Sequence, residues 1–517
     1  MPSSIDPVAW LDAVLETEPG RIFIETPDGR TYTYRDLADI SGQIASALAK
    51  RGVVAGDRVV AKIDKSPEAF MLCVACWRLG AVFVPLNPAY TIPELEYFLT
   101  DAEPRVVVLR PQDKETLAPI AQKKGVACIE TLGDMGDGSL MELSHSRSST
   151  DFPRFIGSPD EPTALLYTSG TTGRSKGAMI TRRNLASNAA ALVQVWRFTQ
   201  ADVLLHALPI FHIHGLFIAC NPVLAAGASM LFLPKFNADE IMRVMPRATV
   251  MMGVPTFYTR LLQDPKLTRN ATAHLRLFIS GSAPLLSETH RQFEIKTGHR
   301  ILERYAMTET LVNTSNPYEG TRLAGSVGLT VPGIEIRAAD PETGRPLSRP
   351  NAVGVLEVRG PNVFKGYWRN PEKTAGEFRP DGFFITGDLG KIDENNYVHL
   401  IGRAKDLIIT GGFNVYPKEV ETEIDALPGV VESAVIGVPH PDFGEGVTAV
   451  VAKAKGATID ERQVLKALAE RLASYKHPKR VLFVDELPRN VMGKVQKNVL
   501  RETYLALYQQ RDRIERS

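Results

Sequence analysis

Residues Tyr167–Met179 read YTSGTTGRSKGAM and lie between an apolar run at 164–166 and a predicted helix that begins near Arg182. Glycines let a backbone turn its N–H groups toward an anion, hydroxyls add further donors, and Lys176 adds a positive charge. Because these groups are threaded into one short loop, the segment predicts a site that holds a polyphosphate.

Two other interpretations of this loop have to be weighed. Counted from Gly170, a P-loop would need glycine, lysine and serine or threonine at 175–177, whereas the chain has Ser175, Lys176 and Gly177. A mobile surface loop would explain the glycine, serine and threonine content. The ordered spacing and the embedded lysine favour phosphate binding, but not a P-loop nucleotidase.

Composition indicates a cytosolic enzyme. The 517 residues suit two or three domains, and 60 Lys+Arg against 59 Asp+Glu give a net charge of +1, which indicates neither a nucleic-acid nor a membrane partner. No targeting segment or bilayer-length apolar run is evident. Four cysteines without zinc-site spacing indicate core residues in a reducing compartment: Cys73, Cys76, Cys128 and Cys220.

The order of apolar patterns predicts an α/β fold. Helix-like and strand-like patterns alternate over 31–160 and again from 201 to 280, which predicts parallel sheets with helices on their faces. From 322, short strands between glycines predict a small β-barrel-like subdomain. We expect an N-terminal domain of 1–402, a hinge at 403–405 and a small α+β C-terminal domain of 406–517.

Further polar segments follow predicted strands, and each alone also fits a turn, a helix cap or a solvated loop. A metal site at the first of them, a histidine pair, would need more ligands, so a pocket-lining histidine is the better interpretation. The segments are HIHG at 212–215, ERYAMTET at 303–310, TGD at 386–388, GRAKD at 402–406 with glycines at 411–412, and NVMGK at 490–494.

In this order, the segments together resemble the adenylate-forming superfamily of acyl-CoA synthetases, luciferases and peptide-synthetase adenylation domains, over almost the whole chain. The resemblance implies that a carboxylate attacks the α-phosphate of Mg-ATP, giving an acyl-adenylate and pyrophosphate. A thiol, here coenzyme A, then attacks the acyl carbon. Lysine, Mg²⁺ and backbone donors would offset the repulsion between carboxylate and polyphosphate. The C-terminal domain would be mobile and would rotate between the half-reactions.

The same resemblance implies catalytic roles for four residues. Thr308 would contact the α-phosphate, Glu309 would bind Mg²⁺ together with Thr168, and Lys494 would bridge the substrate carboxylate and the α-phosphate. His212 would lie near the mouth of the acid pocket. The implied ATP-binding set is Thr168, Ser169, Gly170, Thr171, Thr172, Gly173, Lys176, Gly281, Ser282, Ala283, Glu303, Tyr305, Thr308, Asp388, Arg403 and Lys494.

Within that set, Tyr305 would stack on adenine, and Asp388 and Arg403 would bind the ribose. Lys405 resembles the hinge residue of the family. The thiol tunnel, and with it coenzyme A, would be lined by Gly411, Gly412 and Phe413.

Two arginines indicate the acid. A buried arginine is costly unless an anion meets it, and a dicarboxylate would bring a second carboxylate to Arg260 and Arg304. These positions, together with the amino-acid sequences of 278–285, 360–369 and 411–420, resemble the malonyl-CoA synthetase (malonate–CoA ligase) branch. That branch implies an acid pocket formed by His212, Arg260, Ser282, Arg304 and Met307. The alternatives are a surface arginine at 260 and an ion pair of Arg304 with Glu303.

Two departures from the family pattern leave the size of the acid open. Ala306 replaces the usual glycine, and the segment Thr181–Asn184 carries an arginine where a histidine is usual. Methylmalonate would depend on room beside Ile213, Ala306 and Met307.

Three other functions are weighed against malonate activation: a ligase for methylmalonate, oxalate or a medium-chain monocarboxylate, a module that loads a carrier protein, and a catalytically silent binding protein. The presence of Glu309 and Lys494 argues against the silent protein. We expect a monomer or homodimer, and we expect Lys494 to be a target for lysine acetylation and deacetylation enzymes, because neutralising it removes the bridging charge.

Overall fold

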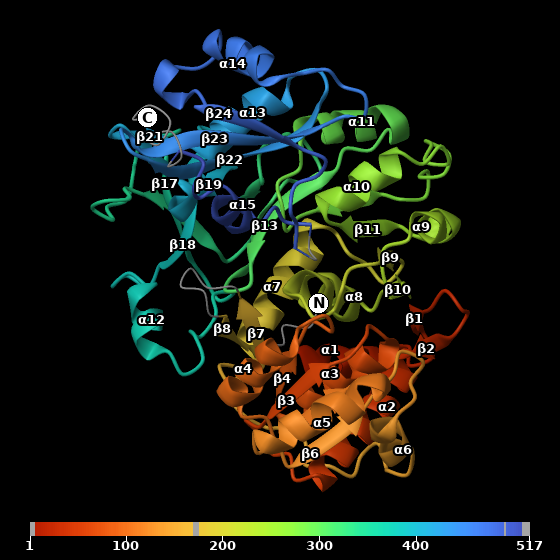
Figure 1. The fold of residues 1–517 in the computed structure, drawn as a ribbon. Coiled ribbons are helices and arrows are strands. Elements are labelled where there is room, and N and C mark those ends of the chain that lie inside the picture. The colour runs from red at the N-terminus through yellow and green to blue at the C-terminus, as the bar shows by residue number, and fades with distance from the viewer. Residues whose placement is uncertain (1–5, 169–174, 491–492, 509–517) are drawn as a thin grey trace. The chain divides into compact units, whose positions relative to one another are not determined.

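A computed structural model describes residues 6–168, 175–490 and 493–508 (Figure 1). The chain has the predicted α/β fold. Internal contacts divide it into two compact units: Met1–Glu335 with Val358–Phe384, and Ile336–Glu357 with Ile385–Ser517. The domain boundary and the hinge expected at 403–405 stay a prediction. Within the described residues, no helix has the length and apolar content needed to cross a bilayer.

The first sheet of the first unit has the strand order β6-β5-β3-β4-β7-β8, and its strands run from red-orange to yellow in the ribbon (Figure 1). All neighbouring pairs are parallel except β7 and β8. Its strands are β3 Arg58–Lys62, β4 Val82–Pro85, β5 Val106–Leu109, β6 Cys128–Thr131, β7 Pro162–Thr168 and β8 Lys176–Thr181. The accompanying helices are α2 Tyr34–Lys50, α3 Pro67–Leu79, α4 Ile92–Ala102, α5 Lys114–Lys123 and α6 Ser139–His145.

Local sequence explains where these elements begin and end. Ser66 caps α3 by accepting a hydrogen bond from the Ala69 N–H, and Gly80 ends the helix with a φ of +75° that favours glycine. A buried core of valine, leucine and phenylalanine side chains joins the strands to α4 and α5. The predicted core positions of Cys73 and Cys76 on α3 are buried.

The second sheet of the first unit has the order β15-β14-β13-β12-β11-β9-β10-β1-β2. Neighbours from β1 to β13 are parallel, and β2, β14 and β15 are antiparallel. Its strands are β1 Ile22–Glu25, β2 Thr31–Thr33, β9 Val203–His206, β10 Ser229–Phe232, β11 Val250–Gly253, β12 Leu277–Ser280, β13 Leu302–Met307, β14 Leu311–Ser315 and β15 Leu329–Thr330. Its helices are α1 Pro7–Thr17, α7 Arg182–Val195, α8 Cys220–Ala226, α9 Ala238–Val244, α10 Pro255–Leu262 and α11 Ser287–Thr297.

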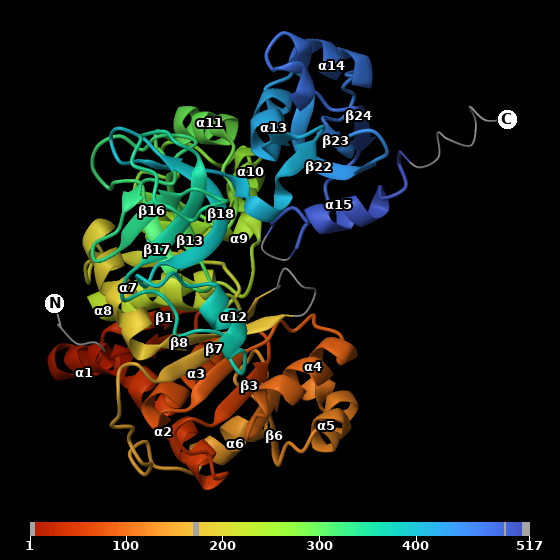
Figure 2. The ribbon, with the colours of Figure 1, turned by 90° about the vertical axis from the view of Figure 1, so that its left-hand side faces the viewer.

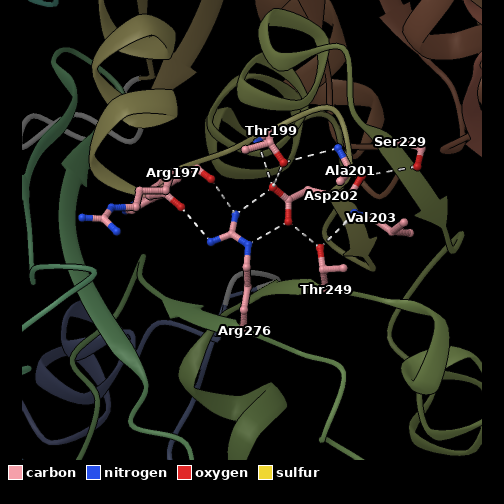
Figure 3. Close-up of polar contacts among 9 residues, drawn as sticks. Arg197, Thr199, Ala201, Asp202, Val203, Ser229, Thr249 and Arg276 are labelled. Atoms are coloured by element: carbon pink, nitrogen blue, oxygen red, sulfur yellow. Dashed lines mark hydrogen bonds and ion pairs between the residues drawn. The ribbon is translucent and has the colours of Figure 1, made fainter.

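A polar network closes the N-terminal ends of three strands in the second sheet (Figure 3). Asp202, Thr249 and Arg276 each precede a strand, and Arg276 donates through Nε and Nη2 to the Asp202 carboxylate at 2.7 and 2.9 Å. The Thr249 hydroxyl donates to Asp202 at 2.7 Å, and the remaining Arg276 donors reach the carbonyls of Trp196 and Arg197. Burial raises the pKa of Asp202, but the bonds from Arg276 and Thr249 outweigh it and leave that pKa lowered.

The second unit contains most of a sheet of order β16-β17-β18-β19 and a C-terminal α+β layer. This four-stranded sheet comprises β16 Glu335–Ala339, β17 Gly354–Arg359, β18 Phe384–Ile392 and β19 Val398–Arg403. In the chain, α12 Pro371–Gly376 lies between β17 and β18, in the segment that belongs to the first unit. In the blue part of the ribbon, α13 packs against β22 (Figure 2). The C-terminal elements are β20 Ile408–Thr410, β21 Phe413–Val415, α13 Pro417–Asp425, β22 Val430–His440, β23 Gly444–Lys453, α14 Glu461–Ala469, β24 Arg480–Val484 and α15 Lys497–Thr503.

Two local features differ from the pattern predicted by the sequence. The glycine-rich loop is followed by β8, antiparallel to β7, so it joins two strands before Thr181 caps α7. The expected helix over 215–224 begins as a π-helical turn, η2 His214–Ala219, before α8. In both places the alternation of apolar residues was too short for the sequence to separate the elements.

Candidate active site

Ser282 and Arg304, two of the residues that the sequence predicts to bind the acid, lie at the C-terminal ends of parallel strands in the second sheet. Ser280 ends β12, Gly281 and Ser282 follow it, and Arg304 lies on β13 one residue beyond the pairing of Ser280 with Glu303. In α/β proteins, ligands bind at this end of a parallel sheet. The strand order therefore places these side chains where a substrate is expected.

Arg304 is buried without a full set of partners. Its exposed fraction is 3%, and its Nε and Nη2 atoms have no hydrogen-bond partner among the described residues. Burial lowers the pKa of the guanidinium to about 9, which still leaves it charged at neutral pH. A buried, incompletely bonded cation costs free energy, so this side chain points to an anion that belongs beside it.

The neighbouring Glu303 does not fill that place. Adjacent residues of a strand point to opposite faces of a sheet, and the Glu303 carboxylate accepts a hydrogen bond from the Leu285 N–H at 3.1 Å. The alternative of a local ion pair between Glu303 and Arg304 is therefore not supported.

The backbone after β12 is shaped around the guanidinium. A Cβ on Gly281 would lie 2.5 Å from Cζ of Arg304, so a side chain here would push the guanidinium out of its place. Ser282 has a φ of +73°, in the left-handed region that serine rarely adopts. Such strain is typical of functional sites, and here it directs the Ser282 hydroxyl to His214 at 3.1 Å from Nδ1.

His214, which the sequence did not single out, lies beside Ser282 and Arg304. It is fully buried in η2, and its Nε2 has no hydrogen-bond partner among the described residues. Burial, and then the nearby Arg304, hold the pKa of His214 well below its usual range, so the ring is neutral. His212 is half-buried, and its Nδ1 accepts the N–H of His214 at 3.2 Å. The HIHG motif names both histidines, but only the fold separates their roles.

A second cluster surrounds Glu309, just after β13. Thr168, the last residue of β7, donates its hydroxyl to the Glu309 carboxylate at 3.4 Å, and the Tyr367 hydroxyl donates at 3.0 Å. Lys176, the first residue of β8, lies over the Tyr367 ring at 5.4 Å from its centroid. Burial, followed by Lys373, lowers the pKa of Lys176, while Glu377 and Glu309 act in the opposite direction.

The donor set of this cluster fits Mg²⁺. A carboxylate and a hydroxyl are the hard oxygen ligands that Mg²⁺ takes alongside substrate phosphates. Between Thr168 and Lys176, the predicted phosphate-binding residues Ser169, Gly170, Thr171, Thr172 and Gly173 lie outside the described residues.

Two predicted groups meet in the second unit. Asp388 on β18 and Arg403 on β19 are register partners, and Arg403 Nε donates to Asp388 at 2.8 Å. Although the Lys494 side chain as a whole is exposed, burial of its ammonium end, followed by the charge of Arg403, lowers its pKa. Lys494 itself is held in a tight turn, because its N–H donates to the Asn490 side chain at 3.0 Å.

Comparison with known proteins gives the family. A model of the AMP-binding enzyme family matches residues 11–368, and a model of the AMP-binding enzyme C-terminal domain matches 419–494. The chain belongs to the AMP-binding enzyme family. Its fold is similar to that of the ATP-bound MatB of Rhodopseudomonas palustris, with 59% sequence identity, a TM-score of 0.94, and coverage of 97% of this chain and 100% of that one.

Two relatives of this AMP-binding enzyme act on different acids. A malonate–CoA ligase of Mus musculus, named as mitochondrial, is 36% identical over 92% of this chain and 87% of its own. An indoleacetate–CoA ligase of Aromatoleum aromaticum is 34% identical over 95% of this chain and 97% of its own. Because the two are about equally similar, the choice of acid has to be argued from the site.

The structure brings some of the predicted acid-pocket residues together and leaves others apart. Ser282 and Arg304 lie beside His214. Arg260 is exposed on α10, with its guanidinium over the Phe236 ring at 5.6 Å.

Tyr305 and Thr308, which the family resemblance assigns to ATP binding, follow Arg304 in the chain. Tyr305 is buried and donates its hydroxyl to Met307 Sδ at 3.2 Å, and Thr308 is half-buried. The segment Thr181–Asn184 lies elsewhere, because the buried Arg182 is paired with Asp6 at 2.7 Å.

The remaining predicted residues lie at turns of the second unit. Lys405 is exposed in a short 3-10 turn. Gly411 and Gly412 join β20 to β21 with φ values of +56° and +81°, a turn that favours glycine at both positions. Phe413 stacks on Tyr475 with ring centroids 4.8 Å apart.

Proposed function

We propose that this AMP-binding enzyme is a malonate–CoA ligase, which joins malonate to coenzyme A through malonyl-adenylate and forms malonyl-CoA, AMP and pyrophosphate. The observation that carries the choice of acid is Arg304, a buried guanidinium whose Nε and Nη2 have no hydrogen-bond partner among the described residues. The non-reacting carboxylate of malonate would accept from both atoms in a bidentate pair. A monocarboxylate would leave the charge uncompensated.

The other walls of the pocket suit a small dicarboxylate. Ser282 and His214 add polar groups beside Arg304, and the His214 Nε2 is a further buried atom that a substrate oxygen can satisfy. Ile213 is buried, and Ala306 and Met307 are half-buried, so added carbon on the acid would meet apolar surface. Methylmalonate is the runner-up, and its acceptance depends on space beside these three side chains.

In the first half-reaction, the negative charges of the ATP phosphates and of the attacking carboxylate would be offset by Mg²⁺ and by two lysines. Glu309 and Thr168 would hold Mg²⁺, which offsets the charge of the ATP phosphates when bound. Lys176 would hold the terminal phosphates with the loop at 169–173, and Thr308 would donate to the α-phosphate. Lys494 would bridge the α-phosphate and the reacting carboxylate.

The rest of the predicted site serves recognition and the second half-reaction. Tyr305 would stack on adenine beside Gly281-Ser282-Ala283, and the paired Asp388 and Arg403 would accept from and donate to the ribose hydroxyls. Rotation at Lys405 would exchange Lys494 for Gly411, Gly412 and Phe413, which would line the path of coenzyme A.

An assay of AMP formation across an acid panel tests the proposal. Purified enzyme with ATP, Mg²⁺ and coenzyme A would be given malonate, methylmalonate, oxalate, acetate and hexanoate in turn. We expect malonate to give the highest kcat/KM. Activation of acetate or hexanoate without malonate would reject the dicarboxylate assignment. A higher kcat/KM for methylmalonate would select the runner-up.

The role of Lys494 has a separate test. Lys494→Ala should lose malonyl-adenylate formation far more than the transfer of preformed malonyl-adenylate to coenzyme A, because the lysine is needed in the first conformation only. Full malonate activation by this variant would reject that role. The same charge makes Lys494 a site for regulation by acetylation, which mass spectrometry of native enzyme and activity before and after deacetylation would examine. A cytoplasmic monomer or homodimer stays a prediction.

A further inference from the structure

Behind the acid pocket lies a chain of buried polar contacts that the proposed reaction does not use. It starts at Lys65, in the turn between β3 and α3, and crosses from the first sheet to the second. The Lys65 amino group lies 2.7 Å from Nδ1 of His206 and donates to the His206 carbonyl at 2.9 Å, and burial lowers the pKa of Lys65 well below its usual range. The amino group also lies 4.1 Å above the centre of the Phe232 ring, the strand partner of His206.

The protonation of His206 follows from these contacts. Burial, and then the neighbouring Lys65, hold the pKa of His206 well below its usual range, so the imidazole is neutral. Because Nδ1 accepts from Lys65, the ring proton lies on Nε2. That N–H donates to the Gly215 carbonyl at 2.8 Å.

Two side chains hold the π-helical turn η2 in place through hydrogen bonds to the Gly215 carbonyl. It receives a second hydrogen bond from the Cys220 thiol at 3.2 Å, and burial raises the pKa of that thiol to about 12, so the donor proton is retained. A Cβ on Gly215 would lie 2.1 Å from the Pro209 carbonyl oxygen, so the backbone of the turn packs directly against Pro209 and leaves no room for a side chain. π-Helical turns are less favourable than α-helix and need such outside support.

The next residue back along η2 is His214, whose ring meets Ser282 and approaches Arg304. We propose that Lys65 and His206 are positioning residues for acid binding: they fix the Gly215 carbonyl and thereby hold His214 in the wall of the carboxylate pocket. This inference rests on the proposed malonate–CoA ligase function, which gives the pocket its occupant.

Two substitutions of His206 separate the positioning path from general packing. In His206→Gln, the amide nitrogen takes the place of Nε2 and can still donate to Gly215. In His206→Asn, the amide takes the place of Nδ1, so the contact with Lys65 can form and the contact with Gly215 is lost. Lys65→Met removes the donor to Nδ1 and frees the imidazole proton to move to that nitrogen.

A buried lysine of the same sheet supplies the matched control. Lys62 is buried at the end of β3 and donates to the Pro88 carbonyl at 2.6 Å, with no contact to η2 among its hydrogen bonds. Lys62→Met therefore removes a comparable buried amino group without disturbing the Gly215 carbonyl. Any loss of acid affinity that it shares with Lys65→Met would be a general effect of destabilisation.

The experiment measures pyrophosphate release for wild type and the four variants, with malonate or propionate as the acid. Loss of one buried hydrogen bond predicts a KM for malonate raised about tenfold in Lys65→Met and His206→Asn, with the KM for ATP within about twofold of wild type. The ratio of kcat/KM for malonate to that for propionate should fall in parallel. His206→Gln and Lys62→Met should keep both the KM and the ratio within about threefold.

Two results would overturn the inference. A malonate KM unchanged in His206→Asn, or equal in His206→Asn and His206→Gln, would show that the Gly215 contact does not position the pocket. A fall in malonate and propionate activity by the same factor would show the same. Failure of the wild-type enzyme to prefer malonate would instead reject the proposed function, and the inference with it, so the two failures are distinguishable.

Discussion

The two ends of the second sheet treat arginine in opposite ways. At the N-terminal ends of the strands, Arg276 is surrounded by acceptors: the Asp202 carboxylate and two backbone carbonyls (Figure 3). At the C-terminal ends, Arg304 is more deeply buried, yet two of its nitrogens have no hydrogen-bond partner among the described residues. The same residue type on neighbouring strands thus has a complete set of partners at one end of the sheet and an incomplete set at the other.

The pKa values follow this difference. Burial lowers the pKa of Arg276, but the bonds from Asp202 outweigh it and leave that pKa raised. For Arg304 the effect of burial prevails and lowers the pKa to about 9. One end of the sheet is therefore complete as protein structure, whereas the other becomes complete when an anion binds. Substitutions at Arg304, Arg276, Asp202 and Arg260 test this difference between the two ends of the sheet.

Arg304→Met should have the largest effect on activity. It removes the charge that pairs with the second carboxylate, so kcat/KM for malonate should fall by about 100- to 1,000-fold, while the KM for ATP changes by less than about threefold. The melting temperature should not fall, because a buried charge without a partner is replaced by an apolar side chain of similar length. Steady-state kinetics and a thermal melt check both parts. A loss of stability with intact malonate kinetics would contradict the assignment.

Arg276→Met should have the opposite profile. It leaves the Asp202 carboxylate buried without its ionic partner, which should cost about 3 kcal/mol of unfolding free energy. The KM for malonate should be unchanged, because the network lies at the far end of the strands. Denaturant unfolding and malonate kinetics measured on one preparation decide the matter. Unchanged stability with a raised KM would erase the distinction between the two ends.

Acid should remove the contribution of the Asp202 carboxylate. Because the folded-state pKa of Asp202 is lowered, its stabilisation is present above the ordinary pKa of an aspartate and is lost as the pH falls through the folded value. Asp202→Asn should therefore be less stable than wild type by about 2 kcal/mol at pH 7, and the two should converge as the pH falls below the folded-state pKa of Asp202. Melting temperatures across this range provide the test, and a constant difference would rule out the carboxylate as the cause.

Arg260→Met should have the smallest effect of the four. The Arg260 side chain is exposed over Phe236, so it gives up less water on meeting a carboxylate than Arg304 does. A rise of about three- to tenfold in the KM for malonate is expected if it completes the pocket. An effect as large as that of Arg304→Met would mean that Arg260 turns inward when the acid binds.

Much of this arrangement could be predicted from the sequence. The alternation of helix and strand patterns gave the α/β class, and the residue types in order identified Glu309, Arg304 and Ser282 as candidates. The partners of individual side chains were harder to predict, because they lie on elements that are distant in the chain. Asp202 and Arg276 are 74 residues apart, and Lys65 and His206 are 141 apart. No local pattern reports such contacts.

The two histidines of the HIHG motif illustrate the same limit. They are separated by a single residue, and the family resemblance assigned the acid-binding role to His212 alone. The π-helical turn buries His214 against Ser282 and leaves His212 half-buried. The exposure of Arg260 was equally hidden, because a helix of eight residues leaves its face undetermined until its neighbours are known.

The contrast between the two arginines is tested best by changing the substrate and the enzyme together. Pyrophosphate release would be measured for wild type and Arg304→Met, each with malonate and with monomethyl malonate, which keeps the reacting carboxylate and neutralises the other. We predict that the kcat/KM of wild type is at least about 100-fold higher for malonate than for the ester. Arg304→Met should show almost no preference, because the ester and the substitution each remove one partner of the same charge pair. An undiminished preference for malonate in Arg304→Met would contradict the claim that Arg304 binds the second carboxylate.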